Sequence, residues 1–231
     1  MCFSATASFV AGASLSAIGL ATLAKAEQRS EIPFAAIPLL FGIQQLVEGV
    51  VWLTFGRDAP VVRHVMTNVY SVFSHVLWPI YVPFAIAFLD TTPWRRKTLR
   101  AFQVAGVVVG LYLAYSLIAR PIVAEVIGRH IVYVSPHFYL LPVIVLYLAA
   151  TCASCFFSSH TFVRLFGILA LLSFIAAAVV HARALVSIWC FFAALLSVLI
   201  YLHLRFRHLG GFPEPHPPPS SGVPVDATAR P

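Results

Sequence analysis

Charged side chains are scarce in this 231-residue chain: Asp, Glu, Lys and Arg make up 10% of it, against 60% hydrophobic residues. Soluble domains carry about 25% charged residues, so water is excluded as the solvent for most of this surface. The sequence also lacks a Gly-x-Ser-x-Gly turn, a phosphate-binding loop, a dinucleotide fingerprint and an arginine ladder, and no Lys lies within 184–204. These absences argue against ATP-driven work, rhodopsin-like photochemistry and voltage sensing.

Long hydrophobic runs, by contrast, fill most of the chain. A helix rises about 1.5 Å per residue, so roughly 20 apolar residues cross a hydrocarbon core near 30 Å thick. The sequence therefore predicts an all-α, polytopic transmembrane bundle with about seven spans. The expected spans are Ser4 to Ala24, Ile32 to Phe55, Met66 to Leu89, Ala101 to Ala119, His137 to Phe157, Thr161 to His181, and Ala184 to Leu204.

Basic residues are unevenly divided between the connections of these spans. Alternate connections carry Lys25, Arg29, Arg95, Arg96, Lys97, Arg100, Arg164, Arg205 and Arg207 on one side, and Arg57, Arg63, Arg120, Arg129 and Arg183 on the other. The richer side should be cytoplasmic, which places the N-terminus outside and the C-terminus inside. The basic residues thus serve to orient the helices in the membrane, which accounts for the net charge of +7. We therefore expect a lipid bilayer as partner and no nucleic acid. The expected location is a bacterial inner (plasma) membrane.

Residues 1–208 are expected to form the transmembrane domain, and the Pro-rich residues 209–231 a disordered cytoplasmic tail. The longest connection, Arg120 to Pro136, is predicted to form a short interfacial helix on the outer surface. Three of the four cysteines, Cys152, Cys155 and Cys190, lie in apolar runs. Small packing residues are the favoured interpretation of the Cys152-x-x-Cys155 pair, with a metal or redox pair as the alternative.

The second run carries an acidic residue inside the membrane. Gln45, Glu48 and Trp52 follow one another at spacings of three and four residues, which puts them on one helix face. A carboxylate at this depth costs several kcal/mol unless it is neutral, paired or hydrated. Glu48 is therefore a functional candidate, with a structural hydrogen-bond anchor between helices as the alternative.

The third run supplies a histidine at a matching depth. Ser71, His75 and Trp78 share a face, Tyr81 follows, and Pro79 frees the His75 carbonyl from its helical hydrogen bond. Counted from the outer ends of their helices, Glu48 and His75 both lie about 10 to 14 Å below the outer surface. Consecutive helices are usually neighbours, so a Glu48–His75 pair is expected at an outward-facing site.

Two chemistries suit such a site. His75, His137, His181 and Glu48 could bind zinc, copper or non-haem iron, and a histidine pair could bind haem, although no His-x-x-x-His motif is present. Alternatively, His75 and Glu48 could hydrogen-bond a quinone or a lipid headgroup between Trp52, Trp78 and Tyr81. Gln45 and Ser71 complete the expected ligand-binding set.

The opening Met1-Cys2-Phe3-Ser4-Ala5 and the string Gln44-Gln-Leu-Val-Glu48-Gly-Val-Val-Trp52 resemble an uncharacterised family of bacterial multi-pass membrane proteins. The resemblance implies no activity; it adds that Gln45, Glu48 and Trp52 match the family's motif and that Cys2 could belong to the outer site. A looser likeness, to seven-helix zinc hydrolases of the ceramidase and adiponectin-receptor type, lacks their paired histidines on the last helix.

The leading hypothesis is a membrane protein whose outward-facing polar site, built around Glu48 and His75, binds a metal, a cofactor or a lipophilic ligand. As an enzyme, it would use Glu48 as a general base, or pass protons from a quinol through His75 and Glu48. The alternatives are a proton-coupled transporter of a small solute, in which Glu48 titrates, and a noncatalytic subunit or sensor of a membrane complex, in which the buried polar groups only join helices.

Overall fold

The structure is a computed structural model, and it describes residues 4–57, 59–128 and 130–206. Cys2, Arg129, Arg207 and the predicted tail at 209–231 lie outside the described residues. The helices are α1 (Ala5–Leu23), α2 (Ile32–Ala35), α3 (Ile37–Phe55), α4 (Pro60–Ser71), α5 (Trp78–Leu89), α6 (Pro93–Ala119), α7 (Leu141–Leu148), α8 (Ser154–Phe156), α9 (Thr161–His181), α10 (Leu185–Leu196) and α11 (Val198–Phe206). Two π-helical turns, η1 (Val72–Leu77) and η2 (Ala149–Ala153), and one 3₁₀ turn, η3 (Ala182–Ala184), join some of them directly.

A mainly helical bundle with helices long and apolar enough for a membrane is confirmed, but the count of seven spans is not supported. Among the described residues, five segments are long and apolar enough to cross a membrane: Ala5–Leu23, Ile32–Phe55, Pro60–Leu89, Pro93–Ala119 and Thr161–Phe206. The fifth predicted run shortens to Leu141–Phe156, because the chain is still extended at Leu140 (φ −67°, ψ 129°). The sixth and seventh runs join into one 46-residue segment, within which the backbone leaves helical geometry at His181 and α10 packs back on α9.

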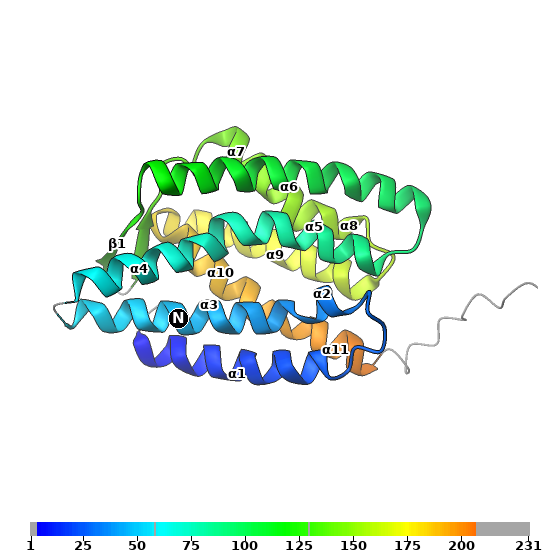
Figure 1. Cartoon of the computed structure of the whole chain (residues 1–231), viewed down its shortest axis with the longest axis horizontal. Helices are drawn as coiled ribbons and strands as arrows, with labels where there is room; N and C mark the ends of the chain where they lie inside the picture. The colour runs from blue at the N-terminus through cyan, green and yellow to red at the C-terminus, as the bar shows by residue number, and fades with distance from the viewer. Residues whose placement is uncertain (1–3, 58, 129, 207–231) are drawn as a thin grey trace, which may run out of the picture.

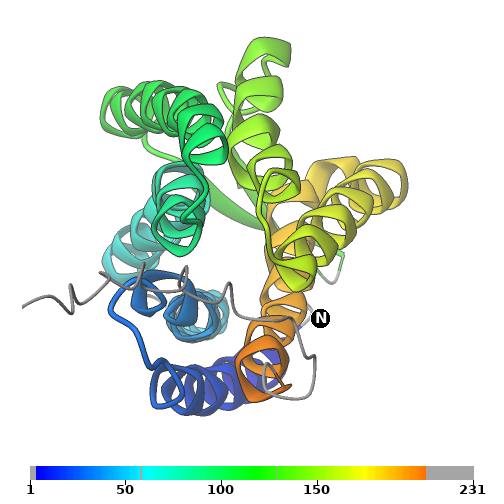
Figure 2. The same ribbon diagram turned by 90° about the vertical axis from the view of Figure 1, so that its right-hand side faces the viewer.

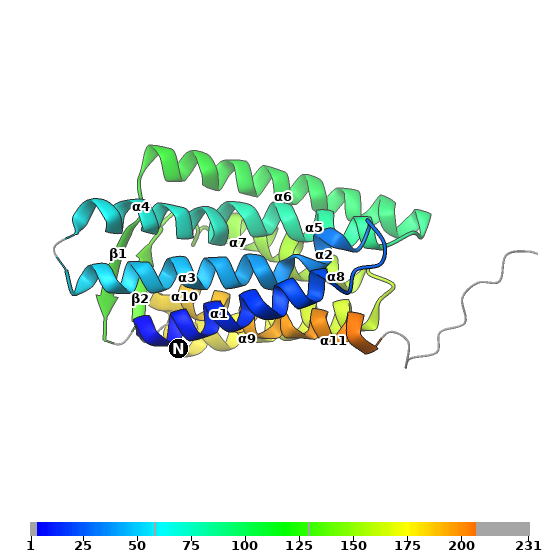
Figure 3. The ribbon, with the colours of Figure 1, turned by 60° about the horizontal axis from the view of Figure 1, so that its bottom comes forward.

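The long helices run side by side, so the molecule has two ends (Figures 1 and 3). One end, which we term the hairpin end, carries the strands β1 (Val123–Ile127) and β2 (His130–Val134). The opposite, basic end carries the connections 24–31, 90–92 and 157–160. Asp90 ties two of these connections together by accepting a 2.7 Å hydrogen bond from the Ser159 amide. The basic residues at this end lie in the connection 24–31 and in the first turns of α6 and α9: Lys25, Arg29, Arg95, Arg96, Lys97, Arg100 and Arg164.

Viewed along their length, the helices pack in pairs, α1 with α3, α5 with α6 and α9 with α10 (Figure 2). Close approach in the first pair depends on small residues, since a Cβ on Gly19 would lie 2.4 Å from the Leu39 amide nitrogen. A Cβ on Gly42 would likewise lie 2.6 Å from the Ser16 nitrogen. In a membrane, helices associate through such close packing because lipid offers no hydrophobic driving force.

The prediction of an interfacial helix at Arg120 to Pro136 is wrong, because this segment forms an antiparallel β-hairpin. β1 pairs with β2 in the register Val123↔Val134 to Ile127↔His130. The segment is rich in Val and Ile, which favour strands, and Gly128 supplies the positive φ (65°) that a tight hairpin turn needs. The hairpin packs on α4, α10 and η3, so it covers one side of the hairpin end.

The third predicted span continues from α4 through η1 into α5. His75 lies within the π-helical turn η1, four residues before Pro79, which cannot donate a backbone hydrogen bond. The π-helical turn absorbs the mismatch that the proline introduces, so the helix continues without ending. Gly106 of α6 allows the close contact at this point, since a Cβ there would collide with the Pro79 carbonyl.

Candidate functional site

Glu48 is completely buried on α3 and its carboxylate is bound by a residue of α10. The Ser187 hydroxyl donates a 2.6 Å hydrogen bond to Glu48 Oε1 across 139 residues of sequence. The Cys190 side chain, one turn further along α10, lies close to Glu48, Gln44 and Tyr70. Helices α3, α4 and α10 thus meet in one buried polar cluster, which we term the Glu48 cluster: Gln44, Glu48, Tyr70, Ser187 and Cys190.

Trp78, at the start of α5, links this cluster to a set of aromatic rings. Its indole nitrogen donates a 2.7 Å hydrogen bond to Gln44 Oε1, and its ring stacks on Phe41 with the centroids 3.9 Å apart. Because Phe41, Gln44 and Glu48 are spaced by three and four residues, one face of α3 presents all three side chains. The Nε2 atom of Gln44 is buried without a hydrogen-bond partner among the described residues.

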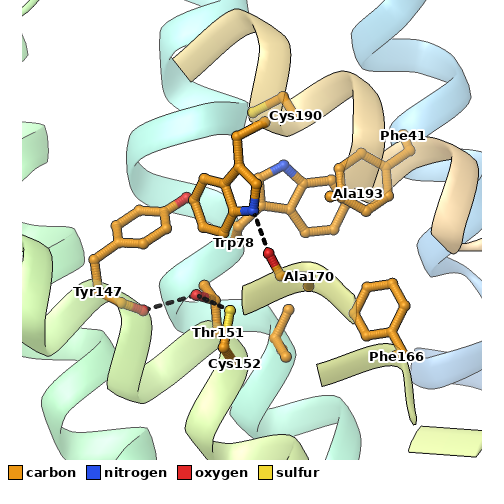
Figure 4. A pocket seen from close by; sticks show the side chains of 11 residues that line it. Phe41, Trp78, Tyr147, Thr151, Cys152, Phe166, Ala170, Cys190 and Ala193 are labelled. Carbon is orange, nitrogen blue, oxygen red and sulfur yellow. Dashed lines mark hydrogen bonds between the residues drawn. The ribbon is translucent and has the colours of Figure 1, made fainter. Parts of the chain in front are cut away.

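Beside the Glu48 cluster lies an apolar cavity with aromatic walls (Figure 4). A water-sized sphere can occupy about 30 Å³ of it, within about 390 Å³ of empty space that includes its open side, and it is lined from α3, α5, α7, η2, α9 and α10. Its walls include Phe41, Trp78, Tyr147, Phe166 and Trp189. Cys190 belongs both to the wall and to the Glu48 cluster. The structure therefore combines a ring-lined space with a polar edge inside the bundle.

His75 is also buried, but its hydrogen bonds lead away from Glu48. Its Nδ1 lies 2.8 Å from Ser74 Oγ, and its Nε2 lies 3.0 Å from Ser135 Oγ, in the segment that follows β2. The imidazole meets the Phe138 ring edge-on at 5.1 Å. The residues predicted to form one pair thus have hydroxyl partners on different elements, Glu48 on α10 and His75 beside the hairpin.

The other predicted ligand-binding residues separate in the same way. Tyr81 donates a 2.8 Å hydrogen bond to the Pro33 carbonyl, which lies 15 residues before Glu48, or about 22 Å along the helices. Ser71 is buried but its hydroxyl is bound to the Thr67 carbonyl of its own helix at 2.7 Å. Trp78 alone of this group lines the cavity.

Gln45 and Trp52 keep unsatisfied polar atoms. Both side-chain polar atoms of Gln45 and the indole nitrogen of Trp52 are buried without hydrogen-bond partners among the described residues. Gln45 lies three residues from both Gly42 and Glu48, at the seam between the α1-facing surface of α3 and the Glu48 face. Such buried polar atoms are costly within a bilayer.

The structure does not gather the predicted metal ligands His75, His137, His181 and Glu48. No group of three or more His, Cys, Asp or Glu placed to hold a metal occurs in the described part of the chain. His137 lies near the Tyr112 hydroxyl (3.4 Å), whereas the His181 ring lies 4.6 Å from that of His130. The histidines of the hairpin end therefore form separate pairs with other residues.

Sequence reasoning missed several members of the site. Gln44 precedes Glu48 by four residues, so the spacing that selected Gln45 could have selected it as well. Ser187 gave no signal beyond being a hydroxyl near the outer end of the last span. Tyr147 was hidden in an apolar run, yet its hydroxyl donates to the Ser74 carbonyl next to His75. The contacts of Ser187 and Tyr147 depend on which faces of distant helices pack together, and the spacing of residues along the sequence does not determine this.

A family model described as a family of unknown function (DUF6629) matches residues 1–213. The chain therefore belongs to this family, in agreement with the resemblance to uncharacterised membrane proteins. No curated protein and no solved structure matches the chain. The family assigns no ligand, so a function has to be argued from the geometry.

Proposed function

We propose that this DUF6629 member is an integral membrane protein that binds a lipophilic, ring-containing molecule of the quinone type in the cavity beside the Glu48 cluster. The observation that carries the proposal is the aromatic wall. Phe41, Trp78, Tyr147 and Trp189 come from four different elements and face one space within the bundle. Flat rings in a ligand bind well between such side chains.

The polar edge of the cavity gives the ligand its orientation. Gln44 uses its side-chain oxygen for Trp78, and its buried Nε2 donor, next to the Cys190 thiol, has no oxygen or nitrogen acceptor among the described residues. A quinone carbonyl oxygen is an acceptor suited to that donor. Glu48 stands one turn further along the same helix face and is held by Ser187. Where the bound ring is a quinol, its hydroxyl proton would pass to this carboxylate, which is the role that the sequence suggests for Glu48.

The proposed orientation in the membrane follows from charge. Lys25 and Arg29 in the connection 24–31 and Arg95 at the start of α6 lie at the basic end, so this end faces the cytoplasm and the hairpin end faces outward. Counting Leu141–Phe156 and the separate helices α9 and α10–α11, the chain would cross a bacterial inner membrane seven times. Fusions of a reporter active only in the cytoplasm, placed within 24–31 and at Gly128, test this: the first should be active and the second inactive.

Ligand binding is tested with a short-chain ubiquinone analogue added to detergent-purified protein, with tryptophan fluorescence as the readout. Trp78 and Trp189 line the cavity, so a bound quinone should quench their emission saturably. Ala170→Leu places a larger side chain into the cavity wall and should weaken binding at least tenfold. Ala176→Leu, a substitution at an exposed position of the same helix α9, is the matched control and should bind as the natural protein does. Equal binding by the two variants would contradict the proposal.

A further inference from the structure

A second, smaller hollow lies at the hairpin end, between the end of α6 and the segment after β2. A water-sized sphere can occupy about 10 Å³ of it, within about 240 Å³ of empty space that includes its open side, and its walls include Arg120, His137, Ser116, Ser135 and His75. We term it the Arg120 hollow. It shares no lining residue with the aromatic cavity, so a ligand in the Arg120 hollow is independent of the function proposed above.

The charges around the Arg120 hollow are of one sign. A guanidinium and two imidazoles line it, and no Asp or Glu belongs to the lining. The hydroxyls of Ser116 and Ser135 also line it; Ser116 donates a 2.9 Å hydrogen bond to the Tyr112 carbonyl, and Ser135 Oγ lies 3.0 Å from His75 Nε2. An arginine with neighbouring hydroxyl and imidazole groups is a combination that suits a phosphate, because Arg presents a fork of N–H donors to its oxygens.

His137 provides the most specific sign of a ligand. Its Nδ1 lies 3.4 Å from the Tyr112 hydroxyl, while its Nε2 is buried and has no hydrogen-bond partner among the described residues. If Tyr112 donates to Nδ1, the ring proton resides on Nε2, which becomes a donor in the wall of the hollow. His75 cannot take this role, since hydroxyls lie within hydrogen-bonding distance of both of its nitrogens.

The other face of α6 and the start of α7 are apolar and exposed. Tyr115 and Ile118, on the last turns of α6, are 70% and 83% exposed, and Leu141 at the start of α7 is 74% exposed. Leu113, Leu117 and Ile122 form an apolar part of the wall itself. A hollow that combines basic groups with an apolar wall at the end of a span fits a phosphate that carries acyl chains, in the way that basic pockets between spans bind lipid headgroups.

We propose that the Arg120 hollow binds a phosphate group, with Arg120 and the Nε2 of His137 as the donors. Two sources share this chemistry, the headgroup of an anionic phospholipid and free phosphate. The apolar wall of Leu113, Leu117 and Ile122 favours the headgroup.

The test is thermal unfolding of delipidated protein in a neutral detergent, titrated separately with dioleoylphosphatidylglycerol, with dioleoylglycerol and with inorganic phosphate at constant ionic strength. Dioleoylglycerol has the same chains without a phosphate. The phospholipid should raise the unfolding temperature saturably, and dioleoylglycerol should not. Stabilisation by inorganic phosphate at equal strength would assign the site to a free anion instead of a lipid.

Arg120→Gln should weaken the apparent affinity for the phosphate ligand about tenfold or more, as expected for loss of a charge-assisted contact. Arg57→Gln, at an exposed position of the same end, is the matched control and should leave it unchanged. His137→Asn, at a partly exposed position, is a second variant should Arg120→Gln fold poorly, and it should weaken binding as well. Equal affinity in Arg120→Gln and the natural protein, or equal stabilisation by dioleoylglycerol, would overturn the proposal.

Discussion

The indole nitrogen of Trp78 donates a 2.7 Å hydrogen bond to the side-chain oxygen of Gln44, and this bond joins α5 to α3 next to the Glu48 cluster. Gln45, the next residue, is buried to the same degree but has no hydrogen-bond partner for either polar atom among the described residues. Two adjacent residues of one type thus differ only in their pairing, which makes them a matched pair for measuring what this bond contributes.

Replacing each glutamine by leucine should have opposite consequences. Gln44→Leu leaves the buried Trp78 donor without an acceptor, which should cost about 1–3 kcal/mol and lower the unfolding temperature in detergent. Gln45→Leu removes two buried polar atoms that lack partners, so stability should stay equal or rise. Circular dichroism melting of the two variants measures this difference. A larger loss for Gln45→Leu than for Gln44→Leu would show that Gln45 has a partner that the structure does not identify.

Spacing along the sequence predicted part of this site and could not predict the rest. The burial of Glu48 and the position of Trp78 beside the same helix follow from periodicity and from the tendency of consecutive helices to pack together. The partner of Glu48 does not, because Ser187 lies 139 residues away and reaches α3 only through the packing of α10. His75 was expected beside Glu48 for its depth alone, whereas depth does not fix the direction in which a side chain points.

The hairpin shows a second limit of prediction from the sequence. The pattern of Arg120 to Pro136 suited an amphipathic helix, but its many Val and Ile residues and Gly128 favour paired strands. Ser135, which bonds His75, belongs to the same misassigned segment. An error in one secondary-structure element therefore concealed the partner of a predicted site residue.

The bond between Ser187 and Glu48 should couple α3 to α10. Ser187→Ala should lower stability by about 1 kcal/mol in the natural chain and have little effect in a Glu48→Leu background, because hydrogen bonds between membrane helices contribute about 0.6 to 1.7 kcal/mol. A double-mutant cycle in detergent measures the coupling. Ser173→Ala is the control, since Ser173 bonds only a carbonyl of its own helix. Additive effects of the two substitutions would contradict a direct bond.

Close packing of α1 on α3 predicts a strong position dependence for glycine substitutions. Gly19→Ala should destabilise the protein by several kcal/mol or prevent folding, because its Cβ would lie 2.4 Å from the Leu39 nitrogen. Gly56→Ala, which meets no atom within 4 Å, should be nearly neutral. Yield of monodisperse protein and melting temperature report the difference. Equal behaviour of the two variants would mean that α1 does not approach α3 so closely.

The hairpin should loosen in acid. Burial, together with the charge of His181, lowers the pKa of His130 below its usual value. The folded state thus favours neutral His130. Its contribution to the stability of the hairpin is fully present above about pH 6.5, the ordinary histidine pKa, and is lost as the pH falls toward the lower pKa that His130 has in the folded state. The groups that face it across the adjoining hollow are His181 on α9 and Arg183 on η3.

Hydrogen exchange of the β1–β2 amides between pH 7.5 and 5.5, corrected for the intrinsic rate, measures this opening. Protection should fall with pH in the natural chain and change less in His130→Gln. His64→Gln, at an exposed position of α4, should behave as the natural chain does. Unchanged protection across this range would contradict the role of the His130–His181 pair.

The central claim is that a ring-containing lipophilic ligand occupies the aromatic cavity beside Glu48, and photolabelling tests it most directly. A photoreactive quinone analogue is irradiated with the protein in lipid nanodiscs, and the modified residues are mapped by mass spectrometry. The account predicts labels on cavity-lining residues such as Thr151, Ala170 and Ala193, lost when excess unlabelled quinone competes. Labels confined to lipid-facing positions such as Val179 and Ile118, and insensitive to competition, would contradict it.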